Sequence, residues 1–225
     1  MLLNFLIKPK FKADVIMSIG RSCRPAKNIY LCGLKRNSYP LDWMYRYNLK
    51  IATDLIANNF KDFFTEIYED ISNVKQEHPY RFIVDKKNDM IDMHTILKET
   101  PLEAGIVESR KMWQRRIQRM YQHFDEAKNI CFVMNCEYKD INDFGYFADK
   151  ISKKYPKKRI LLINIINTDN DNFVIKKERL VKNIKMITAY FRDKNNDPKD
   201  FWMGNTLLWE KVLTDAVILK QEFSK

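Results

Sequence analysis

Short apolar runs alternate along the chain with longer segments in which apolar residues recur every three or four positions. The apolar runs predict strands over 14–19, 130–135, 159–166 and 184–191. The segments with helical spacing predict helices over 23–35, 44–71, 107–128, 141–154 and 206–219. Strands that alternate with helices of this length are typical of a parallel sheet. The pattern therefore predicts an α/β fold of three layers, a mostly parallel sheet with helices on both faces.

Two regions depart from this alternation. Residues 80–84 and 90–96 predict two strands joined by a charged turn, and residues 173–183 fit either a strand or a turn. The 225 residues include only 5 Gly and 7 Pro, so no long flexible linker is expected. We expect a single α/β domain over residues 1–225, with 80–96 as a candidate hairpin insertion.

Cys23 is the most informative residue of the chain. It follows the apolar run 14–19 and Gly20, and it stands where a helix is expected to begin, with Ser22 as the N-cap and Pro25 in the first turn. Backbone N–H groups and the helix dipole at such a position favour the thiolate over the thiol. Sites in parallel sheets form beyond the carboxyl ends of the strands. Cys23 is therefore the expected nucleophile.

A cysteine nucleophile needs a base, and the chain has three histidines. His94 closes the predicted strand that begins at Met90, so we expect it at the same sheet edge as Cys23. His123 lies beside the apolar stripe of a long helix, which favours a structural role. His78 lies in a polar loop. His94 is therefore the expected base.

A third group must orient the base. Asp42 is favoured, because it lies between Pro40 and Trp43 in a segment that follows the cysteine helix closely. The same carboxylate could instead cap the next helix. Asn135 is the rival, since it gives the chain order Cys, His, Asn.

Two motifs carry a family resemblance. The run Ser18-Ile-Gly-Arg-Ser-Cys23-Arg-Pro-Ala, followed by Ser38-Tyr-Pro-Leu-Asp42-Trp43-Met, resembles the putative papain-like cysteine peptidase family. That family also has a histidine closing a middle strand, matched by His94, and a basic helix with paired arginines, matched at 115–119. The resemblance covers most of the chain up to about Asn135. It implies a Cys23 nucleophile with His94 as its base.

The chain also departs from papain. No glutamine precedes Cys23 at the spacing that builds papain's oxyanion hole. Backbone N–H groups over 21–24 are the expected substitute, each donor being worth ~3 kcal/mol in the transition state. Arg24 and Arg116 are expected either to anchor an anionic group or to form salt bridges on helix faces. The residues expected to bind substrate or shape the site are Gly20, Arg21, Ser22, Arg24, Trp43 and Arg116.

Charge and cysteine usage narrow the class of partner. Lys and Arg number 40 against 29 Asp and Glu, a net charge of +11, which suits an anionic ligand. Many lysines lie in loops of mixed sign without a recognised binding motif, so specific nucleic-acid binding is not expected. Cys131 and Cys136 are five positions apart, a spacing that places side chains on opposite faces of a strand, which argues against a zinc site. No metal is expected.

The chain offers no cofactor motif and no targeting segment. Gly20 begins neither a dinucleotide loop nor a P-loop, so no cofactor is expected. Residues 1–7 are apolar but lack a basic leader and a cleavage site, and no apolar run is long enough to span a membrane. Free thiols and a cytoplasmic location are the expectation.

Two functions follow from these observations. The first is a cysteine-dependent hydrolase, a peptidase, amidase or acyl transferase that acts on a peptide, amide or ester through a Cys-His pair. The second is a non-catalytic α/β binding or accessory domain for a polyanionic glycan or a nucleotide-sugar, in which Cys23 is a buried structural residue.

Overall fold

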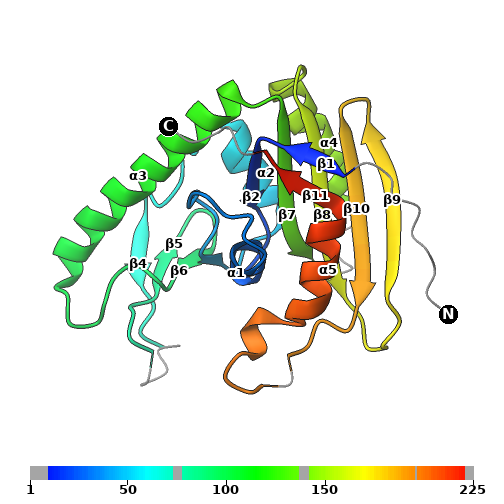
Figure 1. Ribbon diagram of the computed structural model, residues 1–225. Coiled ribbons are helices and arrows are strands. Elements are labelled where there is room, and N and C mark those ends of the chain that lie inside the picture. Colours follow the sequence, from blue (N-terminus) through cyan, green and yellow to red (C-terminus); the bar gives the residue numbers. More distant parts are fainter. Residues whose placement is uncertain (1–9, 73–77, 137–141, 196, 221–225) are drawn as a thin grey trace.

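A five-strand, mostly parallel sheet organises the molecule (Figure 1). The computed structural model describes residues 10–72, 78–136, 142–195 and 197–220. In the order of the sheet, the strands are β2 (Val15–Ser18), β7 (Asn129–Cys136), β8 (Arg159–Asn167), β10 (Ile184–Phe191) and β9 (Val174–Val181). The first four are parallel, and β9 pairs antiparallel with β10. The predicted mostly parallel α/β fold is confirmed.

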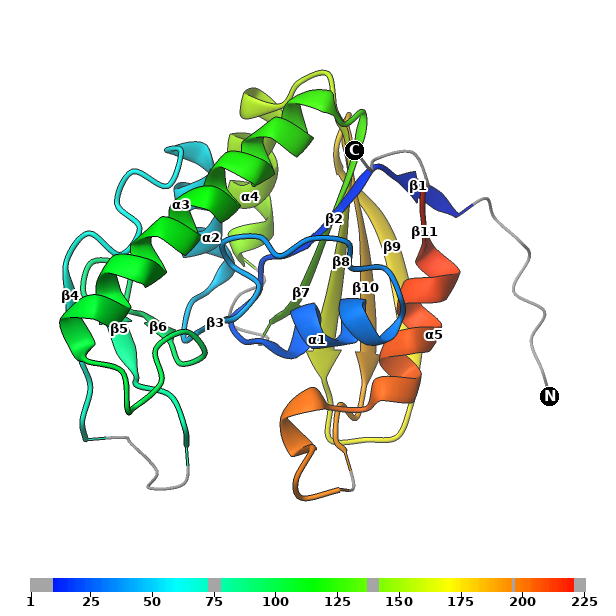
Figure 2. The same cartoon turned by 60° about the vertical axis from the view of Figure 1, so that its left-hand side comes forward.

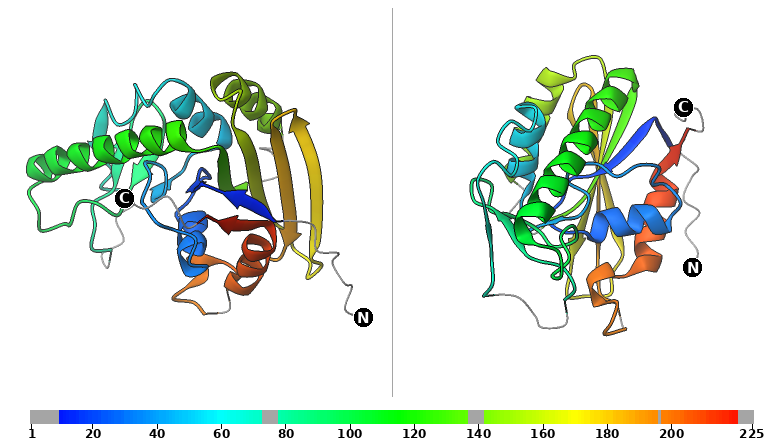
Figure 3. Two further views of the ribbon diagram at one scale, coloured as in Figure 1. Left: turned by 45° about the horizontal axis from the view of Figure 1, so that its top comes forward. Right: turned by 90° about the vertical axis from the view of Figure 1, so that its left-hand side faces the viewer.

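Alternate residues of the central strands enter two different apolar clusters. Phe132 and Leu162 pack in a cluster that includes residues of α2, α3 and α4. Val133 and Ile163 pack in a second cluster with residues of α1 and α5. Figure 3 shows α1 and α5 on the opposite side of the sheet from α2 and α4. The helices are α1 (Arg24–Leu31), α2 (Leu49–Ala57), α3 (Leu102–Glu126), α4 (Asp143–Lys154) and α5 (Thr206–Ala216).

A second, smaller sheet lies beside the first (Figure 2). Its antiparallel strands, in order, are β3 (Met44–Tyr45), β6 (Met90–Asp92), β5 (Ile83–Asp85) and β4 (Ile67–Glu69). Strands β5 and β6 form the hairpin predicted within 80–96, although each strand has only three residues. Its core residues Met44, Ile83 and Met90 belong to the same apolar cluster as Phe132, so the two sheets share a core.

The helix predicted over 44–71 is wrong over most of its length. Only the nine residues of α2 are helical. Asn59, Phe60 and Phe64 have φ angles of +62°, +57° and +50°, in the left-handed region that interrupts a right-handed helix. The aromatic residues in this stretch still enter the core, and they do so from a series of turns. Helical spacing of apolar residues was therefore misleading here.

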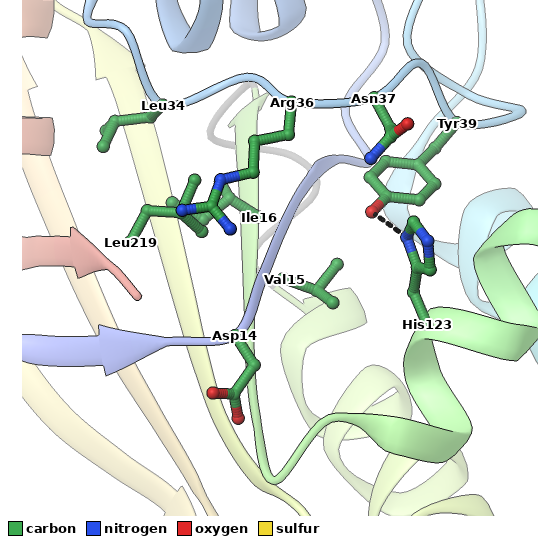
Figure 4. Close-up of a pocket in the computed structure, with 9 residues that line it drawn as sticks. All are labelled: Asp14, Val15, Ile16, Leu34, Arg36, Asn37, Tyr39, His123 and Leu219. Carbon is green, nitrogen blue, oxygen red and sulfur yellow. Dashed lines mark hydrogen bonds between the residues drawn. The ribbon is translucent and has the colours of Figure 1, made fainter. Parts of the chain in front are cut away.

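Strand β2 lies at an edge of the five-strand sheet, a place that its uniformly apolar sequence does not suggest, because such runs are typical of central strands. Residues of the segment over 34–39 line a pocket beside β2, together with Val15 and Ile16 of that strand and His123 of α3 (Figure 4). Tyr39 of this segment shares a 2.8 Å hydrogen bond with Nδ1 of His123 on α3. Burial raises the pKa of Tyr39 and lowers the pKa of His123, so both groups are neutral at pH 7. This contact joins α3 to the segment over 34–39, as a structural role for His123 would require.

Three other helix boundaries differ from the prediction. Helix α1 ends at Leu31, because Gly33 takes a φ of +67°. Helix α3 begins earlier, at Leu102, and α5 ends at Ala216. The chain then continues as β11 (Val217–Leu219), which pairs in parallel with β1 (Phe11–Ala13). The ambiguous stretch 173–183 is strand β9.

Parts of two predictions lie outside the described residues, namely residues 1–7 and residue 141. Within the described part of the chain, no helix is both long and apolar enough to cross a membrane.

Candidate functional site around Cys23 and His94

The loop after β2 carries Cys23 to the start of α1. Cys23 is the N-cap of the helix, with φ −71° and ψ −11°, so the predicted N-cap at Ser22 is wrong by one residue. The Ser22 hydroxyl oxygen accepts a 3.3 Å hydrogen bond from the Arg24 backbone N–H, and the hydroxyl donates to Oδ1 of Asn135, also at 3.3 Å. Pro25 lies in the first turn as expected. Asn135 therefore lies beside the cysteine loop, at the carboxyl end of β7.

Gly20 allows this loop to pass against β7. A Cβ atom at Gly20 would lie 2.5 Å from Cβ of Met134 and 2.8 Å from the backbone nitrogen of Asn135. Contacts this short are not tolerated by any side chain, and the neighbouring atoms are backbone or close to it. Gly20 therefore lets the cysteine loop and β7 approach closely.

The Cys23 side chain is half-buried, and its environment disfavours the thiolate. Burial is the largest influence and raises the pKa of the thiol; the backbone N–H of Cys23 and the positive charge of Arg24 lower it to a smaller extent. The sequence-based expectation of a thiolate stabilised by the helix start is therefore wrong for this state. Desolvation outweighs these two influences, so the thiol keeps its proton in this environment.

His94 follows β6 by two residues, in the small sheet rather than at the rim of the five-strand sheet where it was expected. Its side chain reaches the surface but packs among three rings, with centroids 5.8 Å from Trp43 and 6.3 Å from both His78 and Tyr80. Desolvation by these neighbours lowers the pKa of His94, which Asp92 counteracts and His78 reinforces. The imidazole is neutral at pH 7 and can accept a proton.

Asp92 holds the backbone at His94, and sequence reasoning missed it. The carboxylate is 1% exposed and accepts the His94 N–H at 2.9 Å, the Trp113 indole N–H at 3.1 Å and the Thr95 hydroxyl. An aspartate that accepts from the N–H two residues later is a common way to end a strand. Its place two residues before His94 was the available signal.

Asp42 is buried and binds three donors, none of them an imidazole. Its carboxylate accepts from the Ser18 hydroxyl at 2.8 Å and the Tyr39 N–H at 2.7 Å, and it forms an ion pair with Lys35. The alternative role, capping the next helix, is wrong, because Asn48 caps α2. Asp42 instead fastens the turn 39–42 to the end of β2.

Residues 43–47 connect the two halves of the candidate site. Trp43 packs on His94, and the Arg46 N–H donates to the Arg21 carbonyl at 3.1 Å, two residues before Cys23. Tyr47 is buried, which raises the pKa of its hydroxyl, and the charges of Asp42 and Cys23 raise it further. Segment 43–47 thus lies against both the cysteine loop and the histidine.

No direct bond closes the Cys-His pair in this state. Among the described residues, no hydrogen bond joins Cys23 Sγ to the His94 ring, and none joins that ring to Asp42 or Asn135. Segment 43–47 connects Cys23 and His94 only indirectly. Arg46 bonds to Arg21 in the loop that carries Cys23, and Trp43 packs on His94.

Arg24 is committed to the C-terminal part of the chain. Its guanidinium donates to the Asp193 carboxylate at 2.7 Å and to the carbonyls of Trp202 at 2.8 Å, Phe201 at 3.2 Å and Asp193 at 3.3 Å. These contacts seat α1 against the segment that precedes α5. Of the two roles considered for Arg24, the salt bridge is the one observed.

The comparison with protein families matches residues 14–196 to the family described as "Putative papain-like cysteine peptidase (DUF1796)". The chain belongs to this family. The matched residues include Cys23, Asp42, His94 and Arg116. No curated protein and no solved structure matches the chain.

The cysteines offer no metal site in the described residues. All four are free thiols, and Cys131 and Cys136 belong to the two different core clusters, so they face opposite sides of β7 as predicted. No group of three or more His, Cys, Asp and Glu in the described part of the chain could hold an ion.

Proposed function

We propose that this member of the family is a cysteine-dependent hydrolase, a peptidase, amidase or acyl transferase, with Cys23 as nucleophile and His94 as base. The observation that carries the proposal is segment 43–47, which contacts the cysteine loop through Arg46 and the histidine through Trp43. The family's description supports a peptide as the substrate. The lowered pKa of His94 supports its role as a proton acceptor at pH 7.

The pKa directions favour a neutral pair over a preformed ion pair. The Cys23 thiol keeps its proton, and the His94 imidazole is unprotonated. As Sγ bonds to the carbonyl carbon, its proton passes to His94, and the imidazolium then returns the proton to the leaving amine or alcohol. Water attacks the resulting thioester and His94 takes its proton, which releases the acid and restores the thiol.

The backbone of the cysteine loop is the proposed oxyanion hole. The Ser22 N–H already donates to the Gly20 carbonyl at 2.6 Å, the Arg24 N–H donates to Ser22, and Pro25 has no N–H. We therefore assign the Cys23 N–H, which faces its own sulfur, as the donor to the developing oxyanion.

Asp42 and Asn135 complete the proposal as positioning groups. Asp42 holds the turn before Trp43 to Ser18, and Asn135 holds Ser22. Asp42 stays the proposed third member and Asn135 its rival. The same proposal takes the chain as one three-layered domain in a reducing compartment such as the cytoplasm, which the shared core and the free thiols support.

A peptide-like electrophile tests the Cys-His pair directly. A peptidyl vinyl sulfone should alkylate Cys23, and the site of labelling is read by mass spectrometry. His94→Ala should slow labelling about 100-fold, the low end of what a positioned base contributes. Cys32→Ser is the matched control, because Cys32 is also half-buried and lies at the other end of α1.

The outcome separates the two functions. Selective labelling of Cys23 that depends on His94 supports the hydrolase. Equal, slow labelling of Cys23 and Cys32, unaffected by His94→Ala, would favour the non-catalytic binding domain. The raised pKa of Cys23 is the observation on the side of that second function.

A further inference from the structure

Arg116 occupies a face of α3 that turns toward the candidate site. One helical turn before it, the Trp113 indole donates to Asp92 at 3.1 Å. One turn after it, Arg119 donates to the Ser38 carbonyl at 3.3 Å. Residues three apart on a helix lie on the same face. Arg116 is therefore held between the end of β6, which carries His94, and the segment that carries Asp42.

The guanidinium of Arg116 has no fixed partner in the described part of the chain. Asp42 and Asp92 are close enough to act on its charge, but neither lies within the 4 Å of an ion pair. Both carboxylates already bind three donors each. Five N–H donors of a half-buried cation are thus left for solvent or a ligand.

Partial burial of a guanidinium without a hydrogen-bond partner is unfavourable. Desolvation is the main cause that lowers the pKa of Arg116, and Arg115 and Arg119 lower it further. A guanidinium nevertheless keeps its charge in proteins. The described polar atoms that are sealed from solvent without a partner lie elsewhere, on Asn28, Tyr155 and Asn164, so Arg116 is reachable from outside. An anion that reached it would gain a charge-assisted, bidentate contact.

The surroundings favour an anion over a neutral group. Lys35 neutralises Asp42 and also lies over the Trp43 ring, 5.5 Å from its centroid. Trp43 packs in turn on His94. Arg115 and Arg119 add two positive charges with no ion pair to a carboxylate among the described residues. The net charge of +11 extends this positive field over the molecule.

We propose that Arg116 binds a carboxylate of the substrate, which makes the substrate an acidic peptide with Asp or Glu close to the reacting bond. This inference rests on the proposed function of Cys23 and His94 and names the substrate class of that site. The fork of Arg116 matches a carboxylate in two parallel hydrogen bonds, and the positive field steers an acidic chain toward Trp43.

Binding is measured apart from catalysis, in the Cys23→Ser variant. The probes are a fluorescein-labelled peptide of ten residues with four Glu and its counterpart with four Gln, followed by fluorescence polarisation. The Glu peptide should bind at least about tenfold more tightly, the size of one charge-assisted contact. Arg116→Gln should remove that preference, and Arg116→Lys should keep part of it. A nucleic-acid strand of equal charge should bind less tightly than the Glu peptide.

Arg110→Gln is the matched control. Arg110 is an exposed arginine of the same helix, but it lies with Phe63 and Phe64 beside an apolar hollow, so its loss removes the same charge elsewhere. The inference is overturned if the Glu and Gln peptides bind equally, if neither binds, or if the nucleic acid binds more tightly. It is also overturned if Arg110→Gln weakens binding as much as Arg116→Gln does. Unchanged thermal midpoints exclude misfolding, and failure of vinyl sulfone labelling would count only against catalysis.

Discussion

The two sheets are built on different principles. The five-strand sheet has three strands of eight residues and one of nine, with hydrocarbon on both faces. The small sheet has strands of two or three residues, and three buried carboxylates secure its ends and the loops around it. Asp85 is fully buried and accepts from the N–H groups of Phe64, Lys87 and Asn88. At the other end of the small sheet, Asp92 accepts from the His94 N–H and Asp42 from the Tyr39 N–H.

The two sheets therefore position different residues of the candidate site. The large sheet places Cys23 by close backbone packing, at Gly20 against β7. The small sheet places His94 by hydrogen bonds to charged groups. Burying an unpaired charge costs far more than burying a methylene group, so the histidine side depends more on single residues than the cysteine side does.

Removal of the Asp85 carboxylate tests this division most severely. Asp85→Ala leaves several buried donors without an acceptor, including the Phe64 N–H, and should lower the free energy of unfolding by about 4 kcal/mol. Urea denaturation measures the change. Asp89→Asn in the same turn removes an exposed charge while keeping a residue that tolerates the φ of +49° there, and it should cost less than about 1 kcal/mol. Equal losses in the two variants would contradict the role given to buried charge.

Gly20→Ala tests the packing of the cysteine side. Its Cβ would clash with Met134 and with the backbone of Asn135, so the loop must shift, at a cost of about 2 kcal/mol. Gly145→Ala is the control, because a Cβ there meets nothing within 4 Å. In Gly20→Ala, labelling of Cys23 should change while the ring contact of His94 with Trp43 persists. An unchanged unfolding midpoint would show that the backbones are not in tight contact.

Acidification should lower the stability of the fold through His94 and His123. Burial lowers the pKa of His94 and His123 below the ordinary 6.5, so the unfolded chain binds more protons than the folded one. Stability should therefore fall as the pH drops below about 6.5, until the folded pKa values are reached. Urea midpoints from pH 7.5 to 5.5 measure the slope, and His94→Gln with His123→Gln should flatten it. A midpoint that rises on acidification would reverse the assigned sign.

The smallest expected change in the free energy of unfolding comes from an ion pair on the surface. Lys50 and Asp54 form a 2.8 Å ion pair on α2, and both side chains are well exposed. Lys50→Ala should change the free energy of unfolding by less than about 0.5 kcal/mol. A loss comparable to that of Asp85→Ala would show that burial is not what separates the two kinds of carboxylate.

The sequence predicted the large sheet far better than the small one, for a physical reason. Strands β7, β8 and β10 are apolar runs long enough to specify burial on both faces. In the small sheet only the hairpin of β5 and β6 left a signal, because β3 and β4 are too short to show a period and the order of the sheet comes from contacts distant in sequence. Asp85 with Phe64 is one example and Asp92 with Trp113 is another.

The candidate site was likewise predictable only where a local pattern marked it. The glycine and cysteine after β2 marked the loop of the proposed nucleophile, but the pKa of Cys23 depends on packing that no local pattern reports. His94 was recognisable as a strand-end residue, while its sheet was not. The sequence alone does not distinguish Arg24 from Arg116. Arg24 binds Asp193, whereas the Arg116 guanidinium has no ion-pair partner among the described residues, and this difference separates a structural arginine from one available to a ligand.

The Arg24 contacts tie the first helix to a distant part of the sequence. Its acceptors, Asp193, Phe201 and Trp202, follow it by 169 to 178 residues, and Phe11 pairs with Val217 over a still larger separation. Contacts between residues so far apart cost more loop-closure entropy than local ones and slow folding. The start of the helix after Cys23 is therefore secured by contacts that local structure alone cannot form.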